Sequence, residues 1–282
     1  MQKGSKVAIV CCSNGQKQSY REKIELLKNT LLQQGLVPVF GDYIFERDSV
    51  FSGSGKERAE SLMQFYRDKE IQAIFDISGG DIANEVLPYL DFQTIAESDK
   101  MFWGYSDLTT IINAIYTKTG KKSVLYQVRN LIYDAARAQI VDFSSTVFDG
   151  TDRLFSFDYE FVQGDEMQGI VVGGNIRCLL KLAGTEYWPD MNGKILLLEG
   201  LHGTVPQMIT YLNQLEQIGV FNKVSGILLG TFTEMEENNC VLGMTELVKK
   251  HVGKDLPIIK TWEIGHGSNS KGIVIGEEYY WC

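Results

Sequence analysis

The sequence has no run rich in Lys or Arg, and its 27 basic residues are outnumbered by 36 acidic ones, which gives a net charge of −9 and a pI near 5.0. Proteins that bind nucleic acids or anionic membranes usually do so through clustered Lys and Arg, so neither is expected as a partner. No apolar stretch approaches the roughly 18 residues of a membrane span. The apolar run at residues 7–12 is too short for a signal peptide. We therefore expect a soluble, cytoplasmic protein.

Cysteine and histidine are also scarce, with 5 and 3 residues. Cys11 and Cys12 are adjacent and the other cysteines are scattered, which is neither a disulfide framework nor a zinc-binding pattern. The motifs H-E-x-x-H and C-x-x-C are absent, and no other His, Cys and carboxylate set has the spacing of metal ligands. The sequence therefore predicts reduced thiols, no metal site and no cofactor.

The first 120 residues alternate short apolar runs with helical patterns. Strands are expected at residues 6–12, 37–40, 71–78 and 101–103, with helices between them at 20–35, 55–70 and 82–90. Continuous apolar strands that alternate with helices are typical of a parallel sheet covered on both faces. Ligand sites in such sheets lie beyond the carboxyl ends of the strands. The Gly79-Gly80 turn and Ser106 both fall at such ends.

The α/β pattern weakens at residues 121–164 and then returns. Residues 121–164 show polar clusters without a clear period, so they are interpreted as a crossover, and nothing in them tells whether they form a lid. From residue 165 to 282, runs such as "GIVVGGN", "KILLLEG" and "SGILLGTF" alternate with helical patterns. The expected organisation is thus a first α/β domain at 1–120, a linker at 121–164, and a second β/α domain at 165–282.

Ser106 follows a strand-like run and precedes an amphipathic helix. Four apolar residues fall at i, i+3, i+4 and i+7 of that helix, namely Leu108, Ile111, Ile112 and Ile115. A Ser at this place is routinely a helix cap. Asp107 can do the capping instead, which would leave Ser106 free at a tight turn whose backbone N–H groups face any oxyanion formed there. "GYSD" resembles a nucleophile elbow without its second glycine. Both interpretations stay open on spacing alone.

A serine nucleophile needs a base, and His266 is the best of the three histidines. It lies between two glycines that let the backbone bring an imidazole to a site. His251 ends a helix and His202 lies in a loop, where surface roles are expected. Glu199 ends the apolar run "ILLLE", so an unpaired charge there would be costly. It either forms a structural salt bridge or accepts a hydrogen bond from the imidazole, which gives the triad order Ser, Glu, His.

Five blocks in this order resemble the LD-carboxypeptidase family of serine peptidases, including its microcin C immunity branch. They are "SGGDIANEVLPYLD" (78–91), "GYSDLT" (104–109), "GGNIRCLLKLAGTEYWPD" (173–190), "KILLLEG" (194–200) and "IGHGS" (264–268), and they cover nearly the whole chain. The resemblance implies an N-terminal flavodoxin-like parallel-sheet domain that carries the nucleophile. It also implies a C-terminal swivelling β/α domain that supplies the other two members of a triad, and a homodimer.

By motif, the resemblance assigns the triad to Ser106, Glu199 and His266. It assigns the oxyanion hole to backbone N–H groups of Gly80 and Asp107, and it needs no metal. Gly79 and Asn84 are expected in substrate binding, where "GGDIAN" with "LPYLD" is closer to the microcin branch than to the cell-wall branch.

The family's activity suggests cleavage of an amide bond next to a terminal carboxylate in a small peptide or peptidyl-nucleotide. The favoured substrate is an aspartyl-nucleotide amide, as in microcin C immunity. The alternative is the L,D-bond of muropeptides in cell-wall recycling. A non-catalytic α/β module that binds a small anion is the alternative of another class.

Overall fold

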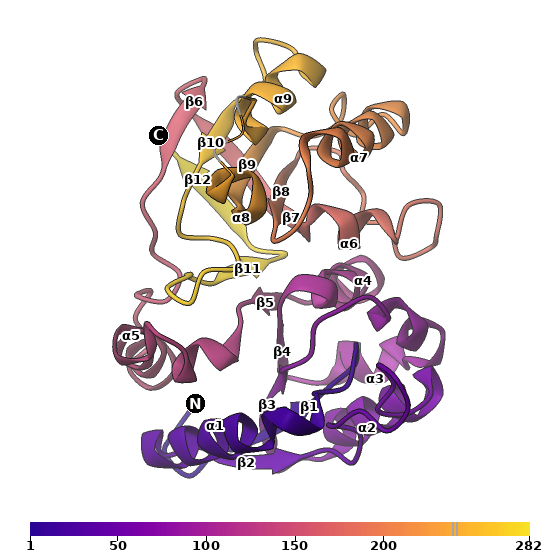
Figure 1. Ribbon diagram of the computed structural model, residues 1–282, viewed down its shortest axis with the longest axis vertical. Helices are drawn as coiled ribbons and strands as arrows, with labels where there is room; N and C mark the ends of the chain where they lie inside the picture. Colours follow the sequence, from indigo (N-terminus) through magenta and orange to yellow (C-terminus); the bar gives the residue numbers. More distant parts are fainter. Residues whose placement is uncertain (239, 241) are drawn as a thin grey trace.

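The computed structural model describes residues 1–238, 240 and 242–282, and within them the chain forms two six-stranded sheets, one in each half of the molecule (Figure 1). The first sheet has the order β11-β5-β4-β3-β1-β2. Its parallel strands come from the N-terminal half: β1 (Lys6–Val10), β2 (Val37–Phe40), β3 (Ile71–Asp76), β4 (Met101–Gly104) and β5 (Ser123–Leu125). Their apolar residues are mostly buried, except on the edge strand β2.

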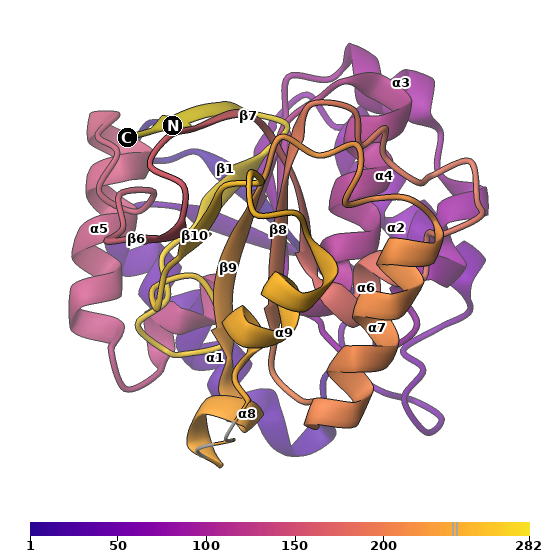
Figure 2. The same cartoon turned by 90° about the horizontal axis from the view of Figure 1, so that it is seen from above.

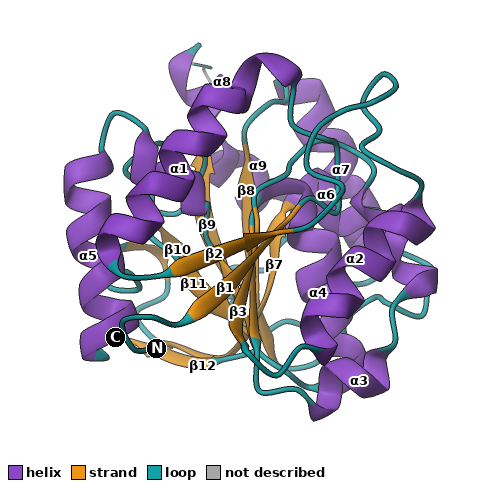
Figure 3. Ribbon diagram, turned by 90° about the horizontal axis from the view of Figure 1, so that it is seen from below, coloured by secondary structure: helices purple, strands orange, loops and turns teal. Residues whose placement is uncertain are grey.

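Helices cover both faces of the first sheet, which is why its central strands are mostly apolar. Figure 3 shows α1 (Arg21–Gln34) and α5 (Ala136–Asp149) on one side, and on the other side α2 (Gly55–Arg67), α3 (Phe92–Glu97) and α4 (Thr109–Thr119). The predicted apolar face of α4 is buried, and the helix ends at Gly120 as its sequence indicates. The 3-10 helices η1 (Gln18–Tyr20), η2 (Ala83–Tyr89), η3 (Ser106–Leu108) and η4 (Val128–Ile132) lie in the connections.

The second sheet has the order β12-β7-β8-β9-β10-β6. The strands β7 (Met167–Asn175), β8 (Lys194–Gly200), β9 (Gly226–Phe232) and β10 (Ile258–Lys260) are parallel, and β6 (Glu160–Gln163) and β12 (Glu278–Trp281) flank them antiparallel. Its helices are α6 (Ile176–Leu180), α7 (Val205–Gln217), α8 (Thr233–Glu237) and α9 (Met244–His251). Figure 2 shows α6 and α7 on the side of the molecule that also holds α4. The predicted α/β fold class, with two parallel-dominated sheets, is confirmed.

Two elements differ from the sequence expectation. The segment 121–164 is not irregular, because it contains β5, α5 and β6. The buried face of α5 is half polar, since Gln139 and Asp142 lie on it with Phe143 and Val147, and this hid its helical period. The strand β11 (Ile273–Ile275) belongs in sequence to the second half, yet it pairs antiparallel with β5 and completes the first sheet. The domain boundaries drawn from the sequence stay a prediction.

The connection between β10 and β11 therefore runs from one sheet to the other, and in Figure 1 β11 lies at the junction of the two halves. No helix of the described part is both long and apolar enough to cross a membrane.

Candidate active site

Ser106 occupies a strained backbone position at the end of β4. Its φ is 56°, and within the described residues only one other non-glycine residue, Ser49, has a positive φ. A side chain in this left-handed region costs energy and marks turns and functional sites. The strand ends at Gly104, and η3 begins at Ser106 itself. The chain therefore turns sharply from strand to helix at this serine, as a nucleophile elbow does.

His266 lies between Ser106 and Glu199. Its Nε2 is 3.2 Å from the Ser106 Oγ, and its Nδ1 is 2.8 Å from Oε2 of Glu199. A carboxylate can only accept, so Nδ1 donates to Glu199 and Nε2 is the atom that accepts from the serine hydroxyl. The structure thus brings together the three residues predicted from the sequence. His251 pairs with Glu216 instead, and the side chain of His202 is 83% exposed.

The three side chains come from three different elements. Ser106 follows β4 of the first sheet, Glu199 lies in β8 of the second sheet, and His266 lies in the connection from β10 to β11. Glu199 is fully buried, at 0% exposure. This connection packs tightly on β9, because a Cβ at residue 265 would collide with the side chain of Thr231. Gly265 therefore lets the imidazole approach the end of the second sheet closely.

Tyr105 is a member of this cluster that sequence reasoning missed. Its hydroxyl donates to Oε2 of Glu199 at 3.0 Å and lies 3.2 Å from Nδ1 of His266, and its ring meets the imidazole edge-on at 4.7 Å between centroids. Burial, and then the neighbouring Glu199, raise the pKa of Tyr105 well above its ordinary value. The signal was present in the sequence: a buried tyrosine beside the candidate nucleophile needs a partner for its hydroxyl.

The Gly79-Gly80 loop lies beyond β3, next to β4 in the sheet. Gly80 has a φ of 125°, and a Cβ there would collide with the side chain of Asn14, whose Oδ1 accepts from the Asp81 N–H at 3.1 Å. Within the described residues, neither the Gly80 N–H nor the Asp107 N–H has a hydrogen-bond acceptor. These two donors are the pair expected at an oxyanion hole. Asn84 lies exposed in η2, and no hydrogen bond joins it to the three residues of the triad.

Asp76 at the end of β3 fixes the start of this loop. One of its oxygens accepts from the N–H and the hydroxyl of Ser78, at 2.8 and 2.6 Å, and the other accepts from the Cys12 N–H at 2.8 Å. Burial raises the pKa of Asp76, while the hydrogen bonds from Ser78 and Cys12 oppose that rise. The ends of β1 and β3 are thereby held together.

Asp107 does not cap α4, contrary to the sequence expectation. Its carboxylate is fully buried and accepts from the Ser13 hydroxyl at 2.6 Å, the Ala83 N–H at 2.8 Å and Lys181 Nζ. The carboxylate points back toward the β1 and β3 loops, so it cannot reach the helix N-terminus. Its role is to hold the residues around the Gly79-Gly80 loop.

Two basic residues on and just after α6 hold the same loop from the other half of the molecule. Arg177 donates to the Gly80 carbonyl at 3.1 Å and pairs with the Asp81 carboxylate. Lys181 donates to the Asp81 carbonyl at 2.9 Å and pairs with Asp107. The carbonyl side of the loop thus faces α6, and the position of Gly80 depends on both sheets.

The cysteines are free thiols, and Cys12 contributes to this region through its backbone N–H, which donates to Asp76. Burial raises the pKa of Cys11 and of Cys12 well above the ordinary thiol value, which disfavours the reactive thiolate form. Within the described residues, no group of three or more His, Cys, Asp and Glu side chains is placed to hold a metal ion.

Comparison with known proteins agrees with this geometry. The family model for the LD-carboxypeptidase N-terminal domain matches residues 7–126, and that for the LD-carboxypeptidase C-terminal domain matches residues 168–280. The chain belongs to the LD-carboxypeptidase family. It is accordingly a serine carboxypeptidase, and the resemblance stated from its sequence motifs is confirmed.

Members of the LD-carboxypeptidase family with different descriptions resemble the chain to similar degrees. It is 27% identical over 270 residues to a probable murein peptide carboxypeptidase of Bacillus subtilis (strain 168), and the alignment covers 90% of this chain and 82% of the relative. It is 24% identical over 269 residues to the microcin self-immunity protein MccF of Escherichia coli, covering 84% and 78%.

Solved structures of the family share the fold along almost the whole chain. An MccF-like protein from Bacillus anthracis str. Ames superposes with a TM-score of 0.86 at 26% identity, covering 99% of this chain and 94% of that one. MccF in complex with aspartyl sulfamoyl adenosine gives a TM-score of 0.87 at 21% identity, covering 99% and 93%.

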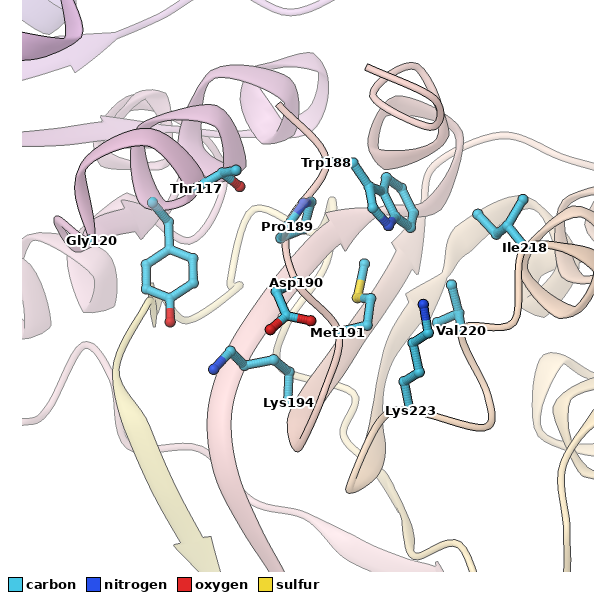
Figure 4. A pocket seen from close by; sticks show the side chains of 11 residues that line it. Thr117, Gly120, Trp188, Pro189, Asp190, Met191, Lys194, Ile218, Val220 and Lys223 are labelled. Atoms are coloured by element: carbon cyan, nitrogen blue, oxygen red, sulfur yellow. The ribbon is translucent and has the colours of Figure 1, made fainter. Parts of the chain in front are cut away.

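The cavity in Figure 4 lies away from this site. It has a volume of about 500 Å³ and opens among residues near Gly120, Trp188, Lys194 and Lys223. Lys194 begins β8, whereas Glu199 lies near the end of that strand. The cavity therefore lies at the opposite end of β8 from Glu199, and neither Ser106, Glu199 nor His266 lines it.

Proposed function

We propose that Ser106, Glu199 and His266 form the catalytic triad of this serine carboxypeptidase. The observation that carries the proposal is the position of His266, with one ring nitrogen 2.8 Å from the Glu199 carboxylate and the other 3.2 Å from the Ser106 hydroxyl. The strained φ of Ser106 and the complete burial of Glu199 support it independently.

In the proposed reaction, Nε2 of His266 takes the proton of Ser106 while Oγ attacks the scissile carbonyl carbon. The Gly80 and Asp107 N–H groups stabilise the oxyanion. The C–N bond then breaks, and the imidazolium gives its proton to the leaving nitrogen, which leaves an acyl group on Ser106. In the second half, His266 takes a proton from a water molecule whose oxygen attacks the ester carbon. The bond to Ser106 then breaks, and the imidazolium gives this proton to Oγ. Glu199 keeps the imidazole in the required tautomer and stabilises its positive form.

The proposed substrate is an amide next to a carboxylate in a peptidyl-nucleotide, as in microcin C immunity. The "GGDIAN" sequence and the similarity to the MccF-like protein support this choice. A muropeptide L,D-carboxypeptidase is the second candidate, which the relative in Bacillus subtilis favours. Hydrolysis of an aspartyl sulfamoyl adenosine and of a tetrapeptide stem, measured side by side, separates the two. Faster release of D-alanine from the stem would overturn the first choice.

A fluorophosphonate probe tests the mechanism. It should label Ser106, and Ser106→Ala should lose the label and about 10⁴-fold or more of kcat. Ser49→Ala is the matched control, because Ser49 is the other serine with a positive φ. That variant should keep both labelling and turnover. Unchanged turnover in Ser106→Ala would refute the nucleophile assignment.

A further inference from the structure

A second hollow opens beside the Gly79-Gly80 loop, and we call it the switch-point pocket. It has a volume of about 210 Å³ and lies among the loops that follow several strands of the first sheet, where it is lined by Asn14, Gln16, Lys17, Glu46, Gly79 and Arg129. Gly79 is the neighbour of the proposed oxyanion donor Gly80. The pocket thus begins one residue from the position where the scissile carbonyl would lie.

Its place in the topology is where open α/β sheets bind ligands. The strands β1 and β3 are neighbours, but α1 after β1 covers one face of the sheet, and α3, the α-helix after β3, lies toward the other (Figure 3). The loops therefore diverge at the carboxyl ends of these two strands and leave a crevice between them. The switch-point pocket occupies this crevice.

Arg129 is held in the pocket by neutral groups. Its Nε donates to Oε1 of Gln127 at 3.1 Å, and its Nη1 donates to Oε1 of Gln16 at 3.2 Å. Gln16 is itself buried and fixed, because its Nε2 donates to the Ile77 carbonyl at 2.8 Å. Among the residues that the structure describes, no carboxylate lies within ion-pair distance of this guanidinium. Arg129 is thus oriented in advance but keeps an uncompensated charge.

The charge and size of the pocket specify its ligand. Arg129 and the exposed Lys17 face a single acidic lining residue, Glu46, so the pocket is positive in a chain of net charge −9. Its volume equals that of about seven water molecules, which suits the end group of a small amino acid rather than a nucleoside. A planar guanidinium matches a carboxylate in two parallel hydrogen bonds.

We propose that the switch-point pocket binds the terminal carboxylate of the substrate and that Arg129 is the residue that recognises it. This inference rests on the proposed function, because it takes Gly80 as the site of the scissile carbonyl. It assigns the residue that makes the enzyme specific for a free carboxylate beside the cleaved bond.

The test compares a substrate with a free terminal carboxylate and the same substrate as its terminal amide. Arg129→Gln should lower kcat/KM by about 10- to 100-fold for the carboxylate, mainly through KM, and change the amide by less than about 3-fold. Arg137→Gln is the matched control, since Arg137 lies exposed on α5 and does not line the pocket. It should have a much smaller effect on both substrates.

A second variant guards against a folding defect. Gln127→Glu keeps the shape of the residue beside Nε but gives Arg129 an internal carboxylate, so it should weaken the carboxylate substrate selectively as well. Equal losses for both substrates in both variants, or no loss in either, would overturn the proposal.

Direct binding separates this inference from the proposed function. N-acetyl-alanine and its amide are titrated calorimetrically into the wild-type protein and into Arg129→Gln. The acid should bind to the wild type only, and the amide to neither. If the wild type hydrolyses no peptide but shows this difference, the proposed function fails while the anion site stands. If N-acetyl-alanine binds both proteins equally, the assignment of Arg129 is wrong.

Discussion

Ser106 and Tyr105 are adjacent in sequence, yet they have different tasks at the site. The positive φ of Ser106 presents Oγ to His266, while Tyr105 is almost fully buried and directs its hydroxyl at the carboxylate behind the imidazole. Within the described residues, Oε1 of Glu199 has no hydrogen-bond partner, so its Oε2 carries both contacts, from Tyr105 and from His266. Tyr105 is therefore expected to position the triad without touching the substrate.

Replacing Tyr105 by Phe tests this role. The variant removes one of the two hydrogen bonds that Glu199 accepts and leaves the ring against His266. We expect kcat to fall by about 3- to 10-fold, which corresponds to one hydrogen bond of about 0.5–1.5 kcal/mol, with KM unchanged. Tyr126→Phe is the control, because Tyr126 is also buried and its hydroxyl donates to Gln139 at 2.7 Å, in contact with α5. It should keep kcat; an equal fall in both variants would contradict the positioning role.

At the residue scale, the sequence predicted which residues form the candidate site but not most of the contacts between them. Ser106, Glu199 and His266 were candidates because each lies at or just after the end of an apolar run, and the resemblance of five sequence blocks to the LD-carboxypeptidase family then selected them as the predicted triad. The destination of the Asp107 carboxylate was not predictable, since its partners Ser13, Ala83 and Lys181 are distant in sequence. Hydrogen bonds to these distant residues outweigh the local preference of Asp107 to cap α4.

At the scale of elements, α6 and the residue after it control the loop that carries Gly80. Lys181 lies at the end of this short helix, and its side chain is 18% exposed, whereas the Asp107 carboxylate that it neutralises is fully buried. Removing one partner of a buried pair leaves an uncompensated charge.

We therefore expect Lys181→Met to destabilise the protein by about 3 kcal/mol and to lower activity, because the Gly80 loop loses its fixed position. Urea unfolding measures the first effect. Lys118→Met is the matched control: Lys118 pairs with Glu186 on the surface, and its loss should cost less than about 1 kcal/mol. Equal stability losses in the two variants would show that Asp107 does not depend on Lys181.

Helices with an apolar face were predictable, whereas α5 was not. The apolar face that begins at Leu108 in η3 continues through α4 with three isoleucines, Ile111, Ile112 and Ile115, so its period is visible in the sequence. The buried face of α5 instead includes Gln139, which accepts from Tyr126, and Asp142, which pairs with Lys271 and Arg153. Polar residues that are satisfied only by distant partners cannot be told from surface residues in a sequence.

At the scale of the whole molecule, one ion-pair cluster joins α5 to the connection that carries His266. Asp142 lies 2.7 Å from Lys271 and 3.1 Å from Arg153, and Lys271 also donates to the Arg153 carbonyl. Burial alone would raise the pKa of Asp142, but hydrogen bonds and charge from Lys271 and Arg153 outweigh it and hold that pKa below its ordinary value. The folded state thus favours the ionised carboxylate.

The lowered pKa of Asp142 determines how the stability of the protein depends on pH. The stabilising contribution of Asp142 is complete above the carboxyl pKa of the unfolded chain, about 3.9, and is lost as the pH falls through the lower pKa of the folded state. Asp142→Asn should lower the free energy of unfolding by about 1 kcal/mol at pH 7, and this difference should shrink as the pH falls below about 3.9. Asp149→Asn, an exposed carboxylate on the same helix, is the control in urea unfolding at both pH values. A difference that is constant with pH would exclude the ionised pair as its cause.

The two-sheet architecture was predictable from the alternation of apolar runs and helices, but the pairing of β11 was not. Three residues, Ile273–Ile275, carry no signal for which of two sheet edges they join. The homodimer, the cytoplasmic location and the domain boundaries stay predictions.

Because β11 pairs with a strand of the first sheet, the two halves of the chain are not expected to fold as separate fragments. The first sheet begins at residue 6 and is completed by residues 273–275. A fragment of residues 1–164 would therefore leave the β11-facing edge of β5 without a partner strand, and a fragment of the remaining residues would contain β11 without β5. Pairings so distant along the chain slow the search for the native state. The proposed catalysis depends on this pairing as well, because His266, the proposed proton acceptor, lies in the segment that leads into β11.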